Sequence, residues 1–321
     1  MNYLRRAMST VLTVTLSLVM STAVLANTTT SSIRGSVATQ AGQTFSNAAV
    51  TITHTPSGTV SRTTTNSSGA FSARSLRVGG PYSISVSGPG FENAKVDDVY
   101  LSLDQGMSVP VVVRASGVME VVAVTAQRLG QTGFKNEGLS TSLGLEALQE
   151  VISIDRDITD AAQLDPFAAV NVQSGGAKEL TIAGANNRFN SLTIDGVALN
   201  DRFGLNANGY PSQRSPISYD AIESLSIQTA PFDVEYNGFT GGTINAVTKS
   251  GTNTFEGSVG YYSTDDSTIG DKNGDDEFDF KFEEETFVAT FGGPIIKDKL
   301  FFFVAYDKYE EIAPLQNGPA G

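Results

Sequence analysis

Side chains capable of covalent or metal chemistry are scarce in this chain of 321 residues, which has no cysteine and one histidine, His54. Without Cys, thiolate metal sites, disulfides and cysteine nucleophiles are excluded, and a histidine-dependent triad would have to use His54. His54 lies in VTITHTP, at an expected strand end, and we interpret it as an ordinary surface histidine. GxSxG, P-loop and dinucleotide-binding motifs are absent from the sequence. We therefore expect no catalytic residues, no cofactor and no enzymatic activity.

An acidic stretch between residues 271 and 282 holds the densest group of candidate metal ligands. Its acidic and amide side chains alternate like the start of an EF-hand loop, which needs Gly at its sixth position and a bidentate Glu at its twelfth. Asp276 and Phe282 occupy those positions, so an EF-hand is excluded. We expect a solvated acidic loop and no metal site, with a looser calcium site as the alternative.

Length and composition indicate a folded protein of two or three domains. The chain has 40% hydrophobic residues and 32 Gly, which is typical of β-rich globular domains. Its formal net charge of −13 argues against nucleic acid as a partner, because a phosphate backbone repels an acidic surface.

Residues 1–26 have the features of a secretory signal peptide. Arg5 and Arg6 precede an apolar run, and Ala26 closes a cleavage site that would leave Asn27 as the mature N-terminus. A transmembrane anchor is the alternative, but Ser and Thr side chains interrupt the run. The mature chain is expected to leave the cytoplasm.

Residues 27–115 are predicted to form an antiparallel β-sandwich. Short runs rich in Val, Ile, Thr and Tyr alternate with turn-forming residues, as in SIRGSVAT, AAVTITH and YSISVSG. Asn66 is placed to close an Asx turn, and Gly69 to adopt a left-handed backbone conformation. The side chains expected to point into the core are Phe71, Leu76, Tyr82 and Val86.

Residues 140–252 are predicted to form a mixed α+β domain. Asp195 and Gly196 tolerate the positive φ of a tight turn and are flanked by alternating apolar residues, which predicts a hairpin. The other expected elements are strands near 222–227 and 242–249 and short helices at 143–151 and 158–164, the second with Asp157 as its N-cap.

From residue 253 to residue 321 the pattern changes to strict alternation. The runs FEGSVGYYS, TFVATFGG and LFFFVAYDKYE each place apolar residues on one face and polar residues on the other, as transmembrane β-strands do. A long acidic connection, 263–285, joins the first two runs, and a tight turn, 294–299, joins the last two. Outer-membrane barrels have long external loops and short periplasmic turns, so we predict 263–285 outside the cell and 294–299 in the periplasm.

Several motifs in the expected order resemble one family. DGVALNDRFGL, APFDVEYNGFTGGTINAVTKSGTN and FEGSVGYY resemble the plug and first barrel strand of TonB-dependent outer-membrane receptors, particularly the Oar-like group. TNSSGAFSARSLRVGGPYSISVSGPGF resembles the carboxypeptidase regulatory-like (prealbumin-type) domain often placed ahead of such plugs. One departure is Ala183, where many plugs carry Arg, so a plug-to-barrel ion pair through that arginine is not carried over.

The resemblance implies a mainly β protein with a prealbumin-like β-sandwich, an α+β plug domain and the first strands of a roughly 22-stranded transmembrane β-barrel. Three strands are far fewer than such a barrel needs, and we expect the chain to be a fragment or a truncated product. The expected domains are the signal peptide 1–26, the carboxypeptidase regulatory-like sandwich 27–115, the TonB-box segment and linker 116–139, the plug 140–252 and the start of the barrel 253–321.

The segment GVMEVVAVTAQ resembles the TonB box of this family. It is a short apolar run between flexible flanks, and an unpaired strand offers backbone donors and acceptors for strand addition by a partner. A last sandwich strand or a plain linker is the alternative. The expected TonB-binding residues are Glu120, Val121, Val122, Ala123, Val124 and Thr125.

A polar loop follows the predicted hairpin of the plug. In the family that the chain resembles, such loops can face the outside and touch the substrate, and packing on the barrel wall is an alternative of equal weight. The candidate substrate-facing residues are Asn200, Asp201, Arg202, Phe203 and Asn206.

The resemblance implies energised uptake of a substrate through a plugged barrel in the outer membrane of a Gram-negative bacterium, with the N-terminal sandwich in the periplasm. The implied partners are TonB, with ExbB and ExbD, and outer-membrane lipid, while iron chelates, oligosaccharides and peptides all stay open as substrates. The alternative is a secreted or surface adhesive or carbohydrate-binding protein that uses the N-terminal sandwich and needs no barrel.

Overall fold

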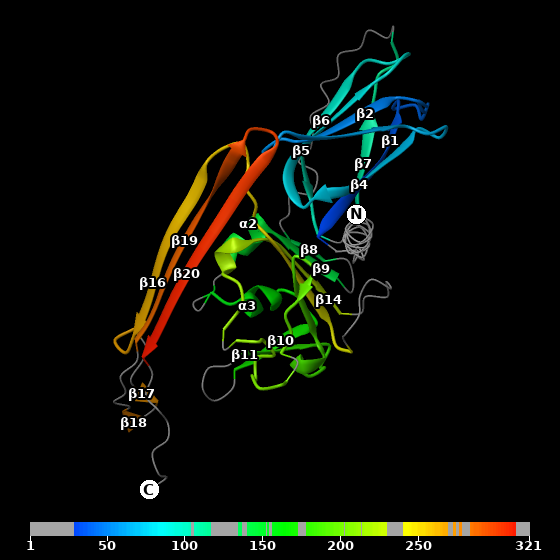
Figure 1. Cartoon of the computed structure of the whole chain (residues 1–321). Coiled ribbons are helices and arrows are strands. Elements are labelled where there is room, and N and C mark those ends of the chain that lie inside the picture. The colour runs from blue at the N-terminus through cyan, green and yellow to red at the C-terminus, as the bar shows by residue number, and fades with distance from the viewer. Residues whose placement is uncertain are drawn as a thin grey trace, which may run out of the picture.

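The computed structural model shows a mainly β chain with three β-rich parts, coloured along the sequence in Figure 1. The structure describes residues 29–103, 106–116, 134–136, 140–151, 153, 156–172, 178–201, 203–212, 214–229, 240–268, 272–273, 276–277 and 283–312.

The first part is a two-sheet sandwich. One sheet has the order β4-β1-β7 and the other the order β3-β2-β5-β6. The antiparallel prediction is wrong for one pair, because β1 and β7 are parallel from Ser32 opposite Gly106 to Ala38 opposite Val112. β7 reaches β1 after β6 of the other sheet, and a crossover between sheets permits parallel pairing. The strands are β1 (Thr30–Ala38), β2 (Ala49–His54), β3 (Thr59–Thr64), β4 (Ala70–Arg77), β5 (Gly79–Ser87), β6 (Ala94–Leu101) and β7 (Gly106–Val112).

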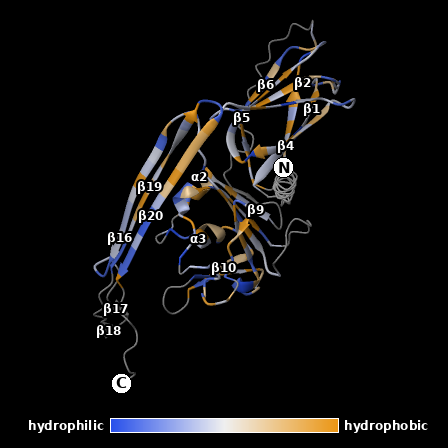
Figure 2. Cartoon of the chain, in the orientation of Figure 1, coloured by the Kyte–Doolittle hydropathy of each residue, from blue (hydrophilic) through white to orange (hydrophobic). Residues whose placement is uncertain are grey.

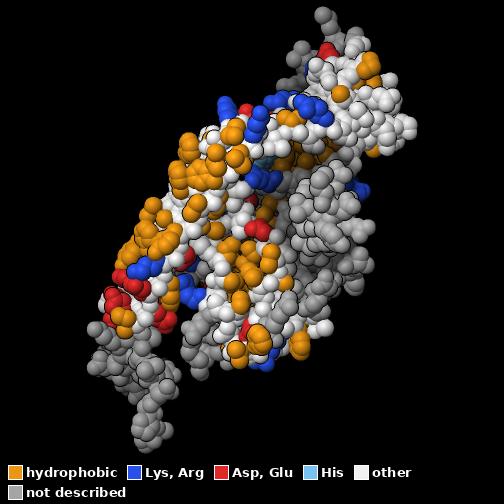
Figure 3. Space-filling view, in the orientation of Figure 1, with side chains coloured by type: hydrophobic (Ala, Val, Ile, Leu, Met, Phe, Trp, Pro, Cys, Tyr) orange, Lys and Arg blue, Asp and Glu red, His pale blue; other side chains and the backbone are white. Residues whose placement is uncertain are grey.

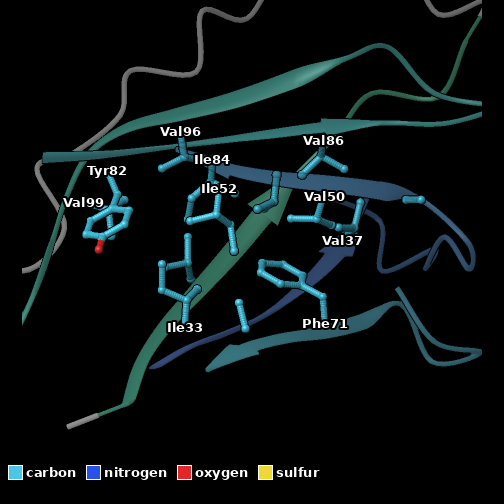
Figure 4. Close-up of a cluster of buried hydrophobic side chains, with 14 of the residues drawn as sticks. Ile33, Val37, Val50, Ile52, Phe71, Tyr82, Ile84, Val86, Val96 and Val99 are labelled. Carbon is cyan, nitrogen blue, oxygen red and sulfur yellow. The ribbon is translucent and has the colours of Figure 1, made fainter. Parts of the chain in front are cut away.

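The sandwich core forms where the inward-facing residues of the two sheets meet, as the close-up in Figure 4 shows. The predicted core side chains are confirmed, since each of the four is at most 7% exposed. The predicted turn is also present: the Asn66 carboxamide oxygen accepts hydrogen bonds from the backbone N–H of Ser68 and Ala70, and Gly69 has a φ of +75°. Burial of these apolar side chains is the main stabilising contribution to the sandwich.

His54 corrects the expectation of a surface histidine. It ends β2, as expected, but it is only 5% exposed and its ring lies 4.8 Å from the Tyr82 ring. Its Nδ1 is 2.7 Å from the Ser57 hydroxyl oxygen. Burial, followed by the charge of Arg77, lowers the pKa of His54 from 6.5 to about 4, so the imidazole is held neutral.

The second part is the plug, built on a six-stranded sheet of order β13-β12-β15-β14-β9-β8. Its helices are shorter than expected, because residues 140–144 form β9 and pair with β14 instead of starting a helix. No helix in the described part of the chain has the length and apolar character needed to cross a membrane. The elements are β8 (Phe134–Asn136), β9 (Ser140–Gly144), α2 (Leu145–Glu150), α3 (Ile158–Ala162), β10 (Ala168–Val172), β11 (Lys178–Ile182), η1 (Asn187–Phe189), β12 (Ser191–Ile194), β13 (Val197–Ala198), η2 (Tyr219–Ala221), β14 (Ile222–Gln228) and β15 (Thr243–Thr248).

Two local predictions in the plug are confirmed. Asp157 caps α3 by accepting a 2.8 Å hydrogen bond from the Thr159 backbone N–H. Asp195 and Gly196 have φ values of 49° and 77° and close the β12–β13 hairpin. The Asp195 carboxylate also accepts hydrogen bonds from the backbone and hydroxyl of Thr248, which ties the turn to β15.

The third part, here called the wall, is the antiparallel sheet β16-β19-β20. Its long strands stand beside the plug, and the turn between β19 and β20 lies at the end nearest the sandwich (Figure 1). Hydrophobic residues concentrate toward that turn and polar residues toward the other end (Figure 2). The strands are β16 (Glu256–Asp265), β19 (Glu283–Ile296) and β20 (Leu300–Ile312), and one short pair of strands, β17 (Lys272–Asn273) and β18 (Asp276–Glu277), lies in the acidic connection.

The predicted alternation is present in the wall. Phe255, Phe291 and Phe302 form a cross-strand group on one face, with ring centroids 5.9 Å and 5.6 Å apart. Val259 on the same face is 75% exposed, whereas Thr286 and Val288 on the opposite face are each 2% exposed. One face of the wall is therefore apolar and open (Figure 3), and the other, here called the covered face, is buried at the central strand β19.

The neutral state of His54 predicts an acid-dependent stability. Because its folded pKa is about 4 and its ordinary pKa is 6.5, only the unfolded chain takes up this proton between those values, so the His54 contribution is complete above pH 6.5 and lost as pH falls toward 4. We expect a smaller fall in sandwich stability across this window in His54→Asn than in the parent, measured as Tm against pH. Equal falls in both proteins would contradict the assignment.

Candidate functional site

Arg156 joins the plug to the wall. Its guanidinium forms an ion pair with the Asp220 carboxylate of η2 and lies 4.8 Å from the Tyr219 ring centroid. The same guanidinium lies 4.9 Å from the ring centroid of Tyr262, which belongs to β16 of the wall. An arginine side chain can bind a carboxylate and stack on aromatic rings at once, because its charge is spread over a plane. Arg156 is therefore a polar contact between the two parts.

A second arginine makes a similar contact, farther from the β19–β20 turn of the wall. The Arg214 guanidinium lies 3.5 Å from the centroid of the Tyr309 ring on β20. Tyr309 and Tyr262 lie on the covered face, since Thr286 of β19 pairs with both of them. Two plug arginines thus contact tyrosines on the same face of the wall.

The space between plug and wall is a cavity of about 520 Å³. Glu223 of β14 and Lys249, just after β15, line it together with Ser258 and Thr290 of the wall, whose hydroxyl oxygens are 2.6 Å apart. Burial raises the pKa of Glu223 and lowers that of Lys249, while the opposite charge of each partner counters the shift. The interface therefore contains polar and charged groups beside apolar ones, whereas the domain cores are mainly apolar.

Two atoms of the Arg156–Asp220 pair lack protein partners among the described residues: the Arg156 Nε and the Asp220 Oδ2. Buried charged atoms of this kind are normally satisfied by hydrogen bonds, and water in the adjoining cavity can supply them. Both residues line the cavity, so these two atoms lie where water could bind them.

The candidate substrate-facing loop divides into bracing and exposed residues. Asn200 accepts a 3.0 Å hydrogen bond from the Leu192 backbone N–H and donates a 2.7 Å bond to the Asn190 carbonyl. The Asp201 carboxylate accepts from the backbone N–H groups of Phe203 and Asn206, and these bonds hold its pKa below the usual range. Arg202 lies outside the described residues.

The exposed apolar side chains are the part of this loop available to a ligand. Phe203 is 87% exposed and Leu205, which the sequence reasoning missed, is 82% exposed. Phe203 was predicted, and the position of Leu205 in the same polar run, DRFGLN, could have identified it too, since exposed apolar residues in a polar loop commonly mark a contact surface. Asn206 is directed inward, because its amide nitrogen donates to the Tyr210 carbonyl.

Several predictions fall outside the described residues. These are the signal peptide, most of the acidic connection and the TonB-box residues at 120–125, all of which stay predictions. Among the residues that are described, no group of three or more His, Cys, Asp and Glu side chains could hold a metal ion.

Comparison with protein families identifies all three parts. Residues 32–116 match the carboxypeptidase regulatory-like domain, residues 140–243 the TonB-dependent receptor plug domain and residues 247–317 an outer membrane beta barrel domain. The chain therefore carries the domains of a TonB-dependent outer-membrane receptor of a Gram-negative bacterium.

Within this class, the sequence is related to a particular transporter. It is 32% identical over 182 residues to the TonB-dependent transporter Oar of Myxococcus xanthus, covering 52% of this chain and 16% of Oar. It is 27% identical over 214 residues to a protein of Acinetobacter baumannii named "Probable TonB-dependent siderophore receptor PirA", covering 60% of this chain and 25% of that protein. The chain thus spans a quarter or less of the length of these relatives.

Solved structures of plugged transporters are also similar to the chain. The siderophore receptor PirA from Acinetobacter baumannii matches with a TM-score of 0.40 and 20% identity, covering 53% of this chain and 24% of that one. The outer membrane transporter YddB from Escherichia coli matches with a TM-score of 0.43 and 16% identity, covering 54% of this chain and 26% of that one.

Substitution of a bracing residue and of an exposed residue in this loop should change the stability of the plug by different amounts. Asn200→Ala removes both bracing hydrogen bonds and should lower the free energy of unfolding of the plug by about 1–3 kcal/mol. Phe203→Ala removes an exposed side chain and should change it by less than about 0.5 kcal/mol. Denaturant unfolding of the purified variants measures both, and a larger loss in Phe203→Ala would show that Phe203 packs on the protein instead.

Proposed function

We propose that the protein is a TonB-dependent transporter that takes up a substrate through a plugged β-barrel in the outer membrane, and not an enzyme. The observation that carries this proposal is the wall, with an open apolar face and a covered face on which Arg156 and Arg214 of the plug contact tyrosines. An apolar outer band suits lipid, and a polar inner face suits a plug that must move.

The polar interface supports such movement. Rearranging a plug held by a packed apolar core would expose apolar surface to water, at roughly 25 cal/mol per Å². Arginine–tyrosine and hydroxyl contacts beside a 520 Å³ cavity can instead be replaced by water contacts at small net cost. The plug can therefore stay seated at rest and shift when it is pulled.

The proposed mechanism assigns one role to each part of the chain. Substrate contacts the exposed loop around Phe203 and Leu205 from outside, and TonB, energised by ExbB and ExbD, adds a strand to residues 120–125 on the periplasmic side. Pulling on this segment shifts the plug and opens a path along the covered face of the wall. The sequence predicts a linker at 116–139 and the plug at 140–252. Residues 120–125, the segment that TonB would pull, therefore precede the plug in the chain.

Val122→Pro tests the strand-addition step. Proline removes a ladder donor and fixes φ, so energised uptake should be abolished, while Val122→Ala should be mild because strand addition depends mainly on backbone hydrogen bonds. Substrate binding should survive in both variants, since the proposed mechanism assigns residues 120–125 to the periplasmic side and substrate contact to the loop around Phe203. Uptake and binding are measured in cells carrying the receptor.

Two outcomes of this experiment would count against the proposal. Retained uptake in Val122→Pro would show that the segment is only a linker. Loss of binding together with uptake would mean that the proline had disturbed the plug itself.

The orientation of the wall gives a separate prediction. Ser267→Cys, in the long acidic connection, should react with an impermeant thiol reagent on whole cells, and Lys297→Cys, in the short turn, should react only after the cells are opened. The reverse labelling pattern would overturn the orientation.

A further inference from the structure

A second cavity, of about 400 Å³, lies between the two sheets of the sandwich and is bordered by the wall. Residues of β2, β3, β4 and β5 line it from the sandwich, and Lys299 and Phe301 line it from the β19–β20 turn and the start of β20. The two sides are fixed together, because Asn253 donates its backbone N–H to the Pro56 carbonyl at 2.8 Å and its amide to Asp298 at 2.7 Å. The cavity thus belongs to the junction of sandwich and wall.

The lining is cationic although the chain is acidic overall. Arg74, Arg77 and Lys299 line this cavity, and none of the other described lining residues is acidic. None of these three cations forms an ion pair with a described residue, although the charge of Arg77 also acts on the buried Glu223 carboxylate. In a chain of net charge −13, an unpaired cationic group is where an anion is most favourably bound.

Hydroxyl groups also line the cavity. The His54 Nδ1, the Ser57 hydroxyl and the Thr59 hydroxyl form a chain with separations of 2.7 Å and 2.9 Å, and Ser57 is only 2% exposed. Ser61 of β3 lines the same cavity. Guanidinium groups bind phosphate oxygens through paired hydrogen bonds, a lysine adds a point charge, and hydroxyls add further donors.

The cavity also lies where a membrane surface would be. Ile295, Ile296 and Leu300 flank the turn that carries Lys299 and are 61%, 52% and 48% exposed. Figure 3 shows Lys and Arg side chains gathered at the junction of sandwich and wall, directly beside the hydrophobic band of the wall. Basic residues next to an apolar band are the usual contact for lipid headgroups at a bilayer surface.

We propose that this cavity binds the phosphate of an anionic phospholipid headgroup in the periplasmic leaflet, and so holds the sandwich against the rim of the barrel. The proposal rests on the proposed orientation of the wall, which the thiol labelling described above tests independently. The same phosphate chemistry would accept inorganic phosphate, but the apolar residues beside Lys299 favour a ligand that carries acyl chains.

The test compares two probes on the detergent-purified receptor by calorimetric titration at matched ionic strength. The probes are short-chain phosphatidylglycerol and inorganic phosphate. We expect phosphatidylglycerol to bind the parent, and the triple variant Arg74→Gln, Arg77→Gln, Lys299→Gln to bind it about tenfold or more weakly, because charge-assisted hydrogen bonds are lost. Arg114→Gln, which removes one charge as Lys299→Gln does but lies near the other end of β1, should bind as the parent does.

A single substitution guards against misfolding of the triple variant. Lys299→Gln alters only an exposed side chain in the turn, so a severalfold weaker affinity in this variant would support the site without touching the sandwich. Equal affinity in the parent, the triple variant and Arg114→Gln would overturn the proposal. Binding of inorganic phosphate as tight as that of phosphatidylglycerol would overturn the lipid source.

Discussion

Arg156 makes the contact on which the seating of the plug depends. Its guanidinium is bound to Asp220 and lies between the rings of Tyr219 and Tyr262, so one cation connects plug and wall. Arg156 is largely removed from water, and this desolvation cost would remain if it lost one of its partners. The contact is therefore most favourable when plug and wall are docked. Because one side of the pair adjoins a cavity, water can take over when the plug moves. In the proposed mechanism, the same contact therefore serves both a resting and a shifted plug.

The two faces of the wall differ because apolar and polar side chains alternate along its strands. Phe255, Phe291 and Phe302 face outward, while Tyr262 and Thr286 face the plug, and each set follows from the two-residue period of a strand. Every backbone group in the hydrocarbon region must be paired within the protein, which is why such strands occur in closed barrels. The sandwich meets this wall at its short turn, because Asn253 donates its backbone N–H to the Pro56 carbonyl of the sandwich and is hydrogen-bonded to Asp298 of the turn.

Local chemistry explains which features could be predicted from the sequence. The Asn66 and Asp195 turns, the Asp157 cap and the alternating wall strands each depend on residues close together in the chain, and all are present. Features that depend on distant residues were missed, such as parallel pairing of β1 with β7, burial of His54 against Tyr82 and the contacts of Arg156 and Arg214. No spacing in the sequence indicates that Arg214 lies over Tyr309, because their approach depends on how plug and wall dock. Ala183 was noted in the sequence as a departure from the resemblance, but it does not indicate that Arg156 and Arg214 contact the wall.

Adjacent residues of one wall strand should face lipid and plug in turn. Spin labels at Val259→Cys and Ser258→Cys of the membrane-embedded receptor test it most directly, since Val259 is 75% exposed on the apolar face and Ser258 lines the cavity beside the plug. At position 259, dissolved oxygen should relax the spin label more than a water-soluble metal complex does, as expected in lipid. At position 258, the metal complex should be the more effective agent, or neither agent should reach the label. Equal oxygen accessibility at both positions, or the reverse pattern, would contradict a wall with a plug behind it.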